Sequence, residues 1–450
     1  MASSPHPRSI AKFLATARKT LAAPRSQRPS PLCLVVGNEA ADLDSFCSAF
    51  LYAYLRSHTP PHFTLHIPLV NLPRPDLALR NDVDGAFATA AVSRDNLLSL
   101  SDLPMSENDK KVGSGLDPHD TRWILVDHNE LTGPLAARFA NRVVGCVDHH
   151  VDECVVPADT GSEPRLIRVC GSAATLVVEH CRETWDYIAT HWIGPEGEDK
   201  KVTDDRPGLP SQLARLVLGP ILVDTQALKA RSKVTPADEE IAALTEAQIR
   251  SDQGGEAYDR IAWYEELCQL KEDLTGFSYR DALRKDYKEW AAPSPIDDNP
   301  DGAGVIRLGI STIPKPFDYL LENVGPVETL VEETRGWARE RGLDLVGIMT
   351  VRPEANHQIS RELMVWAFNE RAVAVARSFA AGWGEDLQLE RWGQGELDSA
   401  ASASTLGSNA ADDTRASEWR MCWHQKNHEH SRKQVAPMLR EAMKQAPPRL

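Results

Sequence analysis

Short runs of consecutive apolar residues recur along the first half of the chain. They occupy residues 31–37 (PLCLVVG), 64–70, 121–126 (TRWILV) and 143–147, and their lengths are those of strands. Unbroken apolar runs are typical of strands that are buried on both faces of a parallel sheet. Apolar residues at helical spacing follow the first run. The pattern therefore predicts an α/β fold with an N-terminal parallel sheet flanked by helices.

The pattern changes near residue 255. Beyond it come long charged helices, and apolar strands are expected at 304–312 and 343–350. A chain of 450 residues is also longer than one typical core requires. We therefore predict two domains with the active site in the cleft between them. They are a catalytic domain over 1–230, a helical linker over 231–255, and a smaller α/β substrate-binding domain over 256–450.

Acidic and imidazole side chains follow the buried elements of the first domain. They are Asp42 and Asp44 after the first run, Asp127 after 121–126, Asp148-His149-His150 after 143–147, and Asp224 after the apolar run 213–223. Ligands in open α/β sheets bind outside the carboxyl ends of the strands. Helix capping by Asp44 or Ser45 is the plain alternative at one position. Helix capping does not explain why Asp or His side chains follow each of these buried apolar runs.

Carboxylates with imidazole suit Mg²⁺, Mn²⁺ or Co²⁺ better than a thiolate-bound zinc. Two such ions held about 3.5–4 Å apart lower the pKa of water between them and stabilise the attacking and leaving oxygens of displacement at phosphorus. Two divalent ions and hydrolysis of a phosphate bond are therefore expected.

Cations in the second half are candidates for phosphate contacts, because arginine binds phosphate through two parallel hydrogen bonds. They include Lys271, Arg361, Arg432 and Lys433, of which the last two open a terminal helix. The alternative is ordinary solvated charge on helices.

Net charge and hydropathy limit the partners. The formal charge is −15 and no continuous basic face is evident, which argues against nucleic-acid binding. No apolar run approaches 18 residues, so no membrane helix is expected. Eight cysteines without a C-x-x-C pair favour a reducing compartment. We expect a cytoplasmic monomer, and the negative net charge does not exclude a small polyanionic substrate that a local cluster of Arg, Lys and metal ions could bind.

The N-terminal 28 residues contain six Lys or Arg and no Asp or Glu. This composition is typical of a mitochondrial transit peptide. The alternative that we favour is an amphipathic helix that packs Ile10, Phe13, Leu14 and Leu21 on the first domain.

The motifs together resemble those of a known superfamily. GNEAADLDS, VDHN, VDHHVDE, GSAATLV and ILVDT resemble the DHH phosphoesterases, and LTGFSYRDALRKDYKEW, GISTIPKP and SRKQVAP resemble their DHHA2 domain. The resemblance covers about residues 31–440. Within the superfamily it is nearest to fungal cytosolic exopolyphosphatases, and prune proteins and family II pyrophosphatases are further away.

The resemblance implies a role for each motif residue. Asp42 would bind one ion, Asp44 the other, Asp127 both, and His149 and Asp224 would complete the second ion's ligands. His150 would face the phosphate and donate a proton to the leaving group, and Asp148 would orient an imidazole. Asn38, His150, Lys271, Arg361, Arg432 and Lys433 would bind substrate.

Asn38 departs from the family II pyrophosphatase pattern, in which this position is a histidine that binds the first metal. Asparagine is a weaker ligand, so Mg²⁺ is expected over tightly bound Mn²⁺. Exopolyphosphatases and prune proteins share the asparagine, but prune proteins lack an intact Asp-His-His. We therefore expect an exopolyphosphatase.

Two alternatives stay open. One is a prune-like enzyme that acts on pyrophosphate, short polyphosphates or nucleotide phosphoesters. The other is an interaction protein that keeps the fold without activity, and the retained acidic and histidine residues argue against it.

Overall fold

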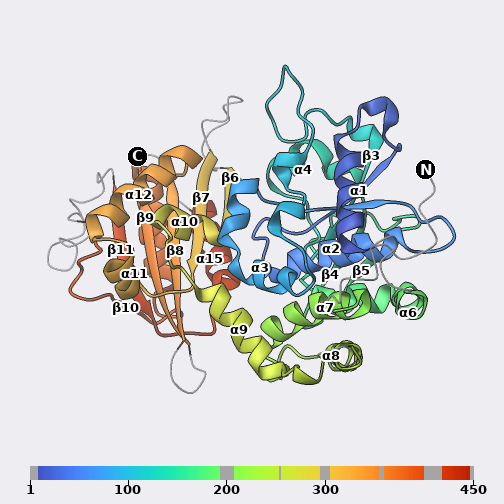
Figure 1. Cartoon of the computed structure of the whole chain (residues 1–450). Coiled ribbons are helices and arrows are strands. Elements are labelled where there is room, and N and C mark those ends of the chain that lie inside the picture. Colours follow the sequence, from blue (N-terminus) through green and yellow to red (C-terminus); the bar gives the residue numbers. More distant parts are fainter. Residues whose placement is uncertain are drawn as a thin grey trace. The chain divides into compact units, whose positions relative to one another are not determined.

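The computed structural model describes residues 9–192, 207–252, 255–293, 305–353, 359–399 and 418–445. The chain divides into two compact units, Met1–Asp273 and Leu274–Leu450 (Figure 1). Each unit has its own sheet and its own buried apolar core. The segment 231–255, suggested by the sequence as a linker, contains helix α8 (Pro236–Arg250), which lies before the division.

The N-terminal unit is built on a five-stranded parallel sheet with the strand order β2-β1-β3-β4-β5. The strands are β1 (Leu32–Val36), β2 (His66–Leu69), β3 (Thr121–Val126), β4 (Val143–Asp148) and β5 (Arg165–Ile167). All five residues of β1 are buried, as an unbroken apolar run requires. The predicted parallel sheet is confirmed.

Helices flank this sheet. They are α1 (Ile10–Ala22), α2 (Leu43–Ser57), α3 (Asn81–Ala88), α4 (Gly133–Phe139), α5 (Ala173–His180), α6 (Arg182–His191), α7 (Leu209–Thr225), α8 and α9 (Arg260–Glu272). Among the described residues, no helix is long and apolar enough to cross a membrane.

Helix α2 is the most deeply buried of these helices. Every residue of it except Arg56 is buried, because it packs against α5, α7 and the strands β1 and β2. Its N-cap is Asp42, whose Oδ1 accepts from the backbone N–H of Ser45 at 3.1 Å. The sequence suggested Asp44 or Ser45 as the cap, and Asp44 is instead a buried residue of the first turn.

The basic N-terminal segment forms α1 over its described part. Ile10, Phe13, Leu14 and Leu21 are all buried in the core of the first unit, as the amphipathic interpretation predicted. The ring of Phe13 lies 5.1 Å from that of Tyr54 in α2, edge to face. Residues 1–8 lie outside the described part of the chain.

The C-terminal unit contains a six-stranded sheet with the order β10-β11-β9-β8-β7-β6, antiparallel except between β7 and β8. Its strands are β6 (Tyr287–Pro293), β7 (Val305–Ile313), β8 (Leu345–Pro353), β9 (Ile359–Ala367), β10 (Leu389–Arg391) and β11 (Trp419–Gln425).

Alternate residues of this sheet belong to two cores. Leu363 and Val365 pack with α13 (Glu370–Trp383) and α15 (Arg432–Gln445). Met364 and Trp366 pack with α10 (Tyr279–Lys285), α11 (Phe317–Asn323) and α12 (Val327–Arg341). Successive strand side chains point to opposite faces, so helices cover both faces of the sheet. The predicted α/β character of this domain is confirmed.

A buried carboxylate, Glu163, joins helix α2 and strand β2 to the segment before β5. It accepts hydrogen bonds from Tyr52 Oη at 2.7 Å and Arg56 Nη2 at 3.2 Å, and it lies 3.4 Å from His66 Nε2. Burial by itself would raise the pKa of Glu163, but these contacts outweigh burial and hold the pKa well below its ordinary value. The ionised carboxylate therefore stabilises the fold.

We predict that Glu163→Gln lowers the free energy of unfolding by about 2–3 kcal/mol at neutral pH, because the Arg56 cation loses its buried partner. A folded-state pKa below the unfolded value means that this stabilisation is complete above about pH 4.5 and is lost as the pH falls through the folded-state pKa. Urea titrations near pH 7 and pH 3 would measure the difference. Glu179→Gln, which removes an exposed pair with Arg168, is the control. Equal losses in the two variants would contradict the prediction.

Candidate metal centre

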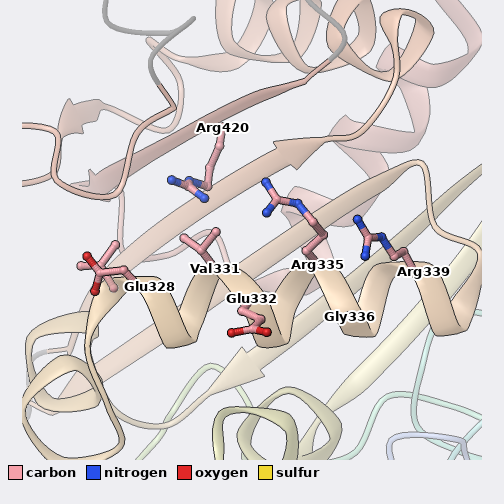
Figure 2. A pocket seen from close by; sticks show the side chains of 8 residues that line it. Glu328, Val331, Glu332, Arg335, Gly336, Arg339 and Arg420 are labelled. Atoms are coloured by element: carbon pink, nitrogen blue, oxygen red, sulfur yellow. The ribbon is translucent and has the colours of Figure 1, made fainter.

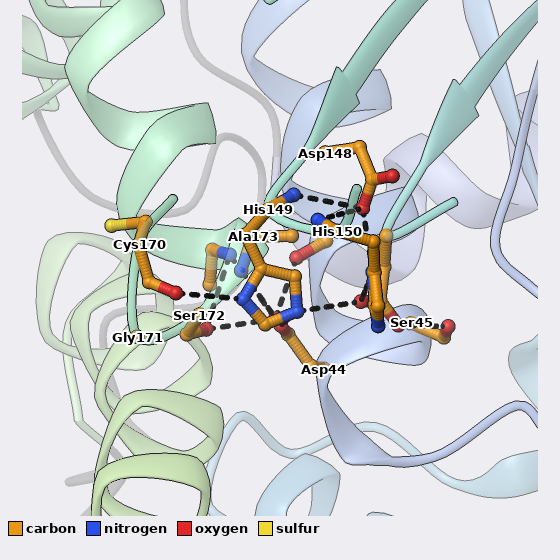
Figure 3. Close-up of polar contacts among 12 residues, drawn as sticks. Asp44, Ser45, Asp148, His149, His150, Cys170, Gly171, Ser172 and Ala173 are labelled. Atoms are coloured by element: carbon orange, nitrogen blue, oxygen red, sulfur yellow. Dashed lines mark hydrogen bonds and ion pairs between the residues drawn. The ribbon is translucent and has the colours of Figure 1, made fainter. Parts of the chain in front are cut away.

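The strand ends predicted to meet do come together at one edge of the N-terminal sheet. Asp127 follows β3, and Asp148, His149 and His150 end or follow β4. Each offers one potential ligand atom, and these four atoms lie within 4.8 Å of one another. His149 Nε2 lies 3.2 Å from Asp127 Oδ1 and 3.9 Å from Asp44 Oδ2 of α2. Figure 3 shows the contacts.

Asp127 is held rigidly in an unusual backbone conformation. Its φ is +61°, in the left-handed region that aspartate tolerates better than most residues. Its N–H donates to the carbonyl of Val147 at 3.0 Å. Oδ2 accepts from Ser45 Oγ at 2.5 Å and from Asn38 Nδ2 at 2.8 Å. One carboxylate oxygen is thereby fixed, and Oδ1 faces the imidazole of His149.

His149 has a defined orientation. Its Nδ1 lies 3.0 Å from the backbone carbonyl oxygen of Cys170. A carbonyl can only accept, so Nδ1 must carry the proton in this contact. Nε2 is then the nitrogen that faces Asp127 and Asp44, and it is the one available to a metal ion.

Asp44 is anchored at the N-terminus of α5. Its carboxylate accepts from Ser172 Oγ at 2.8 Å, Ala173 N at 2.7 Å and Ala174 N at 3.1 Å, and from Ser48 Oγ at 2.9 Å. Exposed amide groups at a helix N-terminus favour negative charge. The start of α5 therefore holds the Asp44 carboxylate in place, where it is only 2% exposed.

Asp148 orients His150. Its Oδ1 accepts from the backbone N–H of His149 and His150 and from His150 Nδ1 at 2.8 Å, while Oδ2 accepts from Asn129 Nδ2 at 2.6 Å. Burial raises the pKa of Asp148, but the bonds from His150 and Asn129 outweigh it and lower the pKa to about 2. Both oxygens are engaged, which makes Asp148 an orienting group. The His150 side chain is one-third exposed and directs Nε2 away from Asp148.

Like charges are concentrated at this edge. Burial first, and then the charges of Asp42 and Asp44, raise the pKa of Asp127 well above its ordinary value. Burial and the same two carboxylates raise the pKa of Asp224, at the end of α7, to about 7. Carboxylates that perturb one another in this way favour a positive charge beside them.

His149 partly supplies that charge. Burial lowers its pKa, but its hydrogen bond to Asp127 and the nearby carboxylates raise the pKa to about 10. The raised pKa means that Nε2 also carries a proton, because the surrounding carboxylates favour a positive charge there. Aspartates with one neutral imidazole nitrogen form a donor set that fits a divalent cation such as Mg²⁺ or Mn²⁺. The cluster can therefore bind metal.

Two predicted substrate residues lie near this cluster in the same unit. Lys271, at the end of α9, lowers the pKa of Asp224 through its charge, opposing the larger effects of burial and the aspartates. Asn38 is 7% exposed, and its amide donates to Asp127 and accepts from Ala41 N at 3.1 Å. In this arrangement Asn38 positions Asp127, and a direct contact with substrate stays a prediction.

The other predicted cations belong to the C-terminal unit. Arg361 of β9 donates from Nε to the carbonyl of His428 at 2.9 Å, and burial lowers its pKa. Arg432, the first residue of α15, forms an ion pair with Asp286 at 2.7 Å, and Lys433 follows it. Protein contacts orient both arginines, and their roles towards substrate stay predictions.

A hollow of about 670 Å³ lies beside α12 and Arg420 of β11 in the C-terminal unit (Figure 2). It is lined by Val327, Glu328, Val331, Glu332, Arg335, Gly336, Arg339 and Arg420. Arg335 is bonded to Glu418 at 2.8 Å and lies over the ring of Trp366. None of the predicted substrate residues lines this hollow.

Sequence reasoning missed the residues that hold the ligands in place. Ser45 and Ser172 donate to Asp127 and Asp44, and Asn129 donates to Asp148 and to the carbonyl of Val151. Each lies inside a motif already singled out. A search of those motifs for side-chain donors next to the acidic residues would have found them.

The parallel sheet carries aspartate and histidine side chains at the carboxyl ends of its strands. These features define an α/β protein with a candidate divalent-metal centre. The DHH family N-terminal domain matches residues 33–218, and the DHHA2 domain matches residues 265–442. The chain therefore carries a domain of the DHH family followed by a DHHA2 domain, as the motifs indicated.

It is similar to several known proteins. A Schizosaccharomyces pombe protein named "Putative exopolyphosphatase" is 29% identical over 420 residues, 93% of each chain. Rat "Exopolyphosphatase PRUNE1" is 27% identical over 76% of this chain, and the match spans 65% of the rat protein, less than two thirds. The crystal structure of a Methanococcus jannaschii putative family II inorganic pyrophosphatase aligns with a TM-score of 0.48 and 17% identity, over 91% of this chain and 98% of that one.

We predict that Asp224→Asn stabilises the metal-free protein near pH 8 by about 1–2 kcal/mol, because it removes a negative charge beside Asp42 and Asp44. The raised pKa sets the sign: ionising Asp224 costs stability as the pH rises from about 4 through about 7, and asparagine avoids this cost. Urea unfolding in EDTA at pH 5 and pH 8 would measure it.

The matched control is Asp186→Asn, which removes an exposed carboxylate paired with Arg182. With Mn²⁺ in place of EDTA the wild type should be more stable than Asp224→Asn, because binding of the cation stabilises the wild type more. A variant no more stable than wild type near pH 8 in EDTA would contradict the assignment of Asp224 to the cluster.

Proposed function

We propose that this protein is an exopolyphosphatase. It hydrolyses the terminal phosphoanhydride bond of inorganic polyphosphate and releases orthophosphate. The support comes from the acidic and histidine cluster together with a relative named "Putative exopolyphosphatase" that matches over 93% of both chains. The observation that carries the proposal is that Asp127, held from behind by Ser45 and Asn38, directs its other oxygen at His149 amid further carboxylates.

Asp42, Asp44, Asp127, His149 and Asp224 would hold two divalent ions, Mg²⁺ or Mn²⁺, with Co²⁺ as a further candidate. Ions bound there would activate water and neutralise charge on the phosphate oxygens. Asp127 is the residue proposed to bind both ions, and its Oδ1 lies 3.2 Å from His149 Nε2 and 3.7 Å from His150 Nδ1. The Ser172, Ala173 and Ala174 donors hold Asp44 against the repulsion of the other carboxylates.

His150 is the proposed proton donor to the leaving phosphate. Asp148 keeps a proton on Nδ1 of His150, which leaves Nε2 to face substrate. Because Asp148 stays ionised across the neutral range, it holds the His150 ring in this orientation. Arg361, Arg432, Lys433 and Lys271 are the proposed phosphate-binding cations, and Asn38 is proposed at the substrate side of Asp127.

A prune-like enzyme that prefers pyrophosphate, short polyphosphates or nucleotide phosphoesters is the alternative. The 27% identity with rat "Exopolyphosphatase PRUNE1" supports this alternative. We place the protein in the cytoplasm as a monomer that binds neither nucleic acid nor membrane. These assignments are part of the proposal.

We predict rapid release of orthophosphate from long-chain polyphosphate with Mg²⁺, Mn²⁺ or Co²⁺, little release from pyrophosphate, and none in EDTA. A colorimetric phosphate assay on both substrates, side by side, would test this. Preference for pyrophosphate or chains of a few units would move the proposal to the prune-like alternative. Full activity in EDTA would contradict the metal-dependent mechanism.

We predict that Asp127→Asn lowers kcat for polyphosphate at least about 1,000-fold, because the oxygen that would bind both ions is replaced by a weaker ligand. Asp152→Asn, in the neighbouring VDHHVDE motif, is a matched control, since Asp152 pairs with Arg165 outside the cluster. Near-normal turnover by Asp127→Asn would refute the central role of Asp127.

Arg432→Ala should act differently and raise KM about tenfold with a smaller change in kcat, because it removes a phosphate contact rather than a metal ligand. Lys444→Ala, in the last turn of the same helix and 64% exposed, is the control. An unchanged KM in Arg432→Ala would remove Arg432 from the substrate site.

A further inference from the structure

Another buried aspartate, Asp238, contacts the segment next to the proposed metal ligands but is not one of them. It occupies the third position of α8 and is fully buried. Within α8 it forms a capping box: Oδ2 accepts from Thr235 N at 2.8 Å and Thr235 Oγ1 at 2.7 Å. A capping residue normally serves only its own helix, but this carboxylate accepts further hydrogen bonds from a distant segment.

That segment is 170–175, which comprises the turn before α5 and the first residues of that helix. Gly171 N donates to Asp238 Oδ2 at 2.9 Å, and Thr175 Oγ1 and Cys170 Sγ donate to Oδ1 at 2.7 and 3.2 Å. Burial raises the pKa of Asp238, but these bonds and those from Thr235 outweigh burial and lower it. The carboxylate is therefore ionised at neutral pH and binds the turn strongly.

The turn approaches Asp238 too closely for a larger residue at position 171. A Cβ added to Gly171 would lie 2.8 Å from Asp238 Oδ2 and 2.5 Å from Cγ2 of Thr225. Thr225 directly follows Asp224 at the end of α7. The same glycine thus packs the turn against both Asp238 and the helix end that carries a proposed metal ligand.

The groups held by Asp238 are the ones that orient two other proposed ligands. The carbonyl of Cys170 accepts from His149 Nδ1, which sets the nitrogen that faces Asp127. Ser172, Ala173 and Ala174 donate to the carboxylate of Asp44. These contacts are visible in Figure 3 along the segment from Cys170 to Ala173. A shift of this turn would change both ligands together.

We propose that Asp238 is a positioning residue of the metal centre: through Gly171, Thr175 and Cys170 it fixes the turn that orients His149 and Asp44 for a divalent cation. This inference rests on the proposed function in one respect, the assignment of His149 and Asp44 as metal ligands. It adds that the affinity for the metal ion depends on a helix-capping residue that contacts none of the proposed metal ligands.

The test measures Mn²⁺ binding to the whole metal-free chain by isothermal titration calorimetry, so that the readout does not depend on turnover. The variants are Asp238→Ala, which removes all the accepted bonds, and Asp238→Asn, which keeps an oxygen for the two backbone N–H groups. Asp281→Ala is the matched control, because Asp281 closes the equivalent capping box with Ser278 in α10 and has no contact with the turn.

We expect Asp238→Ala to weaken Mn²⁺ binding about 10- to 100-fold, as loss of an orienting partner behind a metal ligand does, with a smaller loss in Asp238→Asn. Asp281→Ala should bind Mn²⁺ as the wild type does, although it also loses a cap. Raising Mn²⁺ should restore most of the kcat of Asp238→Asn, since the ligands themselves remain. Circular dichroism before each titration separates this effect from loss of stability, because Mn²⁺ binding would also refold a destabilised chain.

Folded Asp238→Asn and Asp238→Ala that bind Mn²⁺ within twofold of the wild type would overturn the inference. If Asp238→Ala does not fold, Asp238→Asn and Thr175→Val still decide it, because each removes only part of the contact. A wild-type chain that binds no Mn²⁺ would instead contradict the proposed function. The two failures are therefore distinguishable.

Discussion

Repulsion among buried carboxylates is the constraint that shapes the N-terminal unit. Asp127 and Asp224 are pushed towards their protonated forms by burial and by Asp42 and Asp44, and His149 is driven to hold a proton. Such an arrangement is costly without a cation and persists only where the surrounding structure over-determines it. The left-handed backbone at Asp127 and the amide groups at the start of α5 are parts of that surrounding structure.

Helix α2 makes this concentration of charge feasible. It is buried on nearly all sides, so the first turn that carries Asp44 cannot move away from its neighbours. Its N-cap is itself a proposed ligand, Asp42, so the start of the helix and one side of the metal centre are defined by the same residue. Packing of the apolar core therefore sets the positions of charged groups that would otherwise separate.

The sequence predicted the architecture well because the relevant signals are local. Unbroken apolar runs marked β1, β3 and β4, and the residues directly after them include Asp127 and His149. The amphipathic spacing of Ile10 to Leu21 was likewise sufficient for α1. The helix cap was harder, because Asp42, Asp44 and Ser45 are all good caps and only the backbone geometry selects Asp42. The contacts of Asp238 with Gly171 join residues 67 positions apart, and a capping pattern alone does not report such a contact.

The orientation of His149 depends on a main-chain atom. The carbonyl of Cys170 accepts the proton of Nδ1, so the identity of the side chain at 170 has no direct part in choosing the tautomer. Most residues at that position would present the same oxygen, provided that the turn kept its path. The path of the backbone therefore determines the tautomer. Mutations of the residues that shape the turn, rather than of residue 170 itself, would change it.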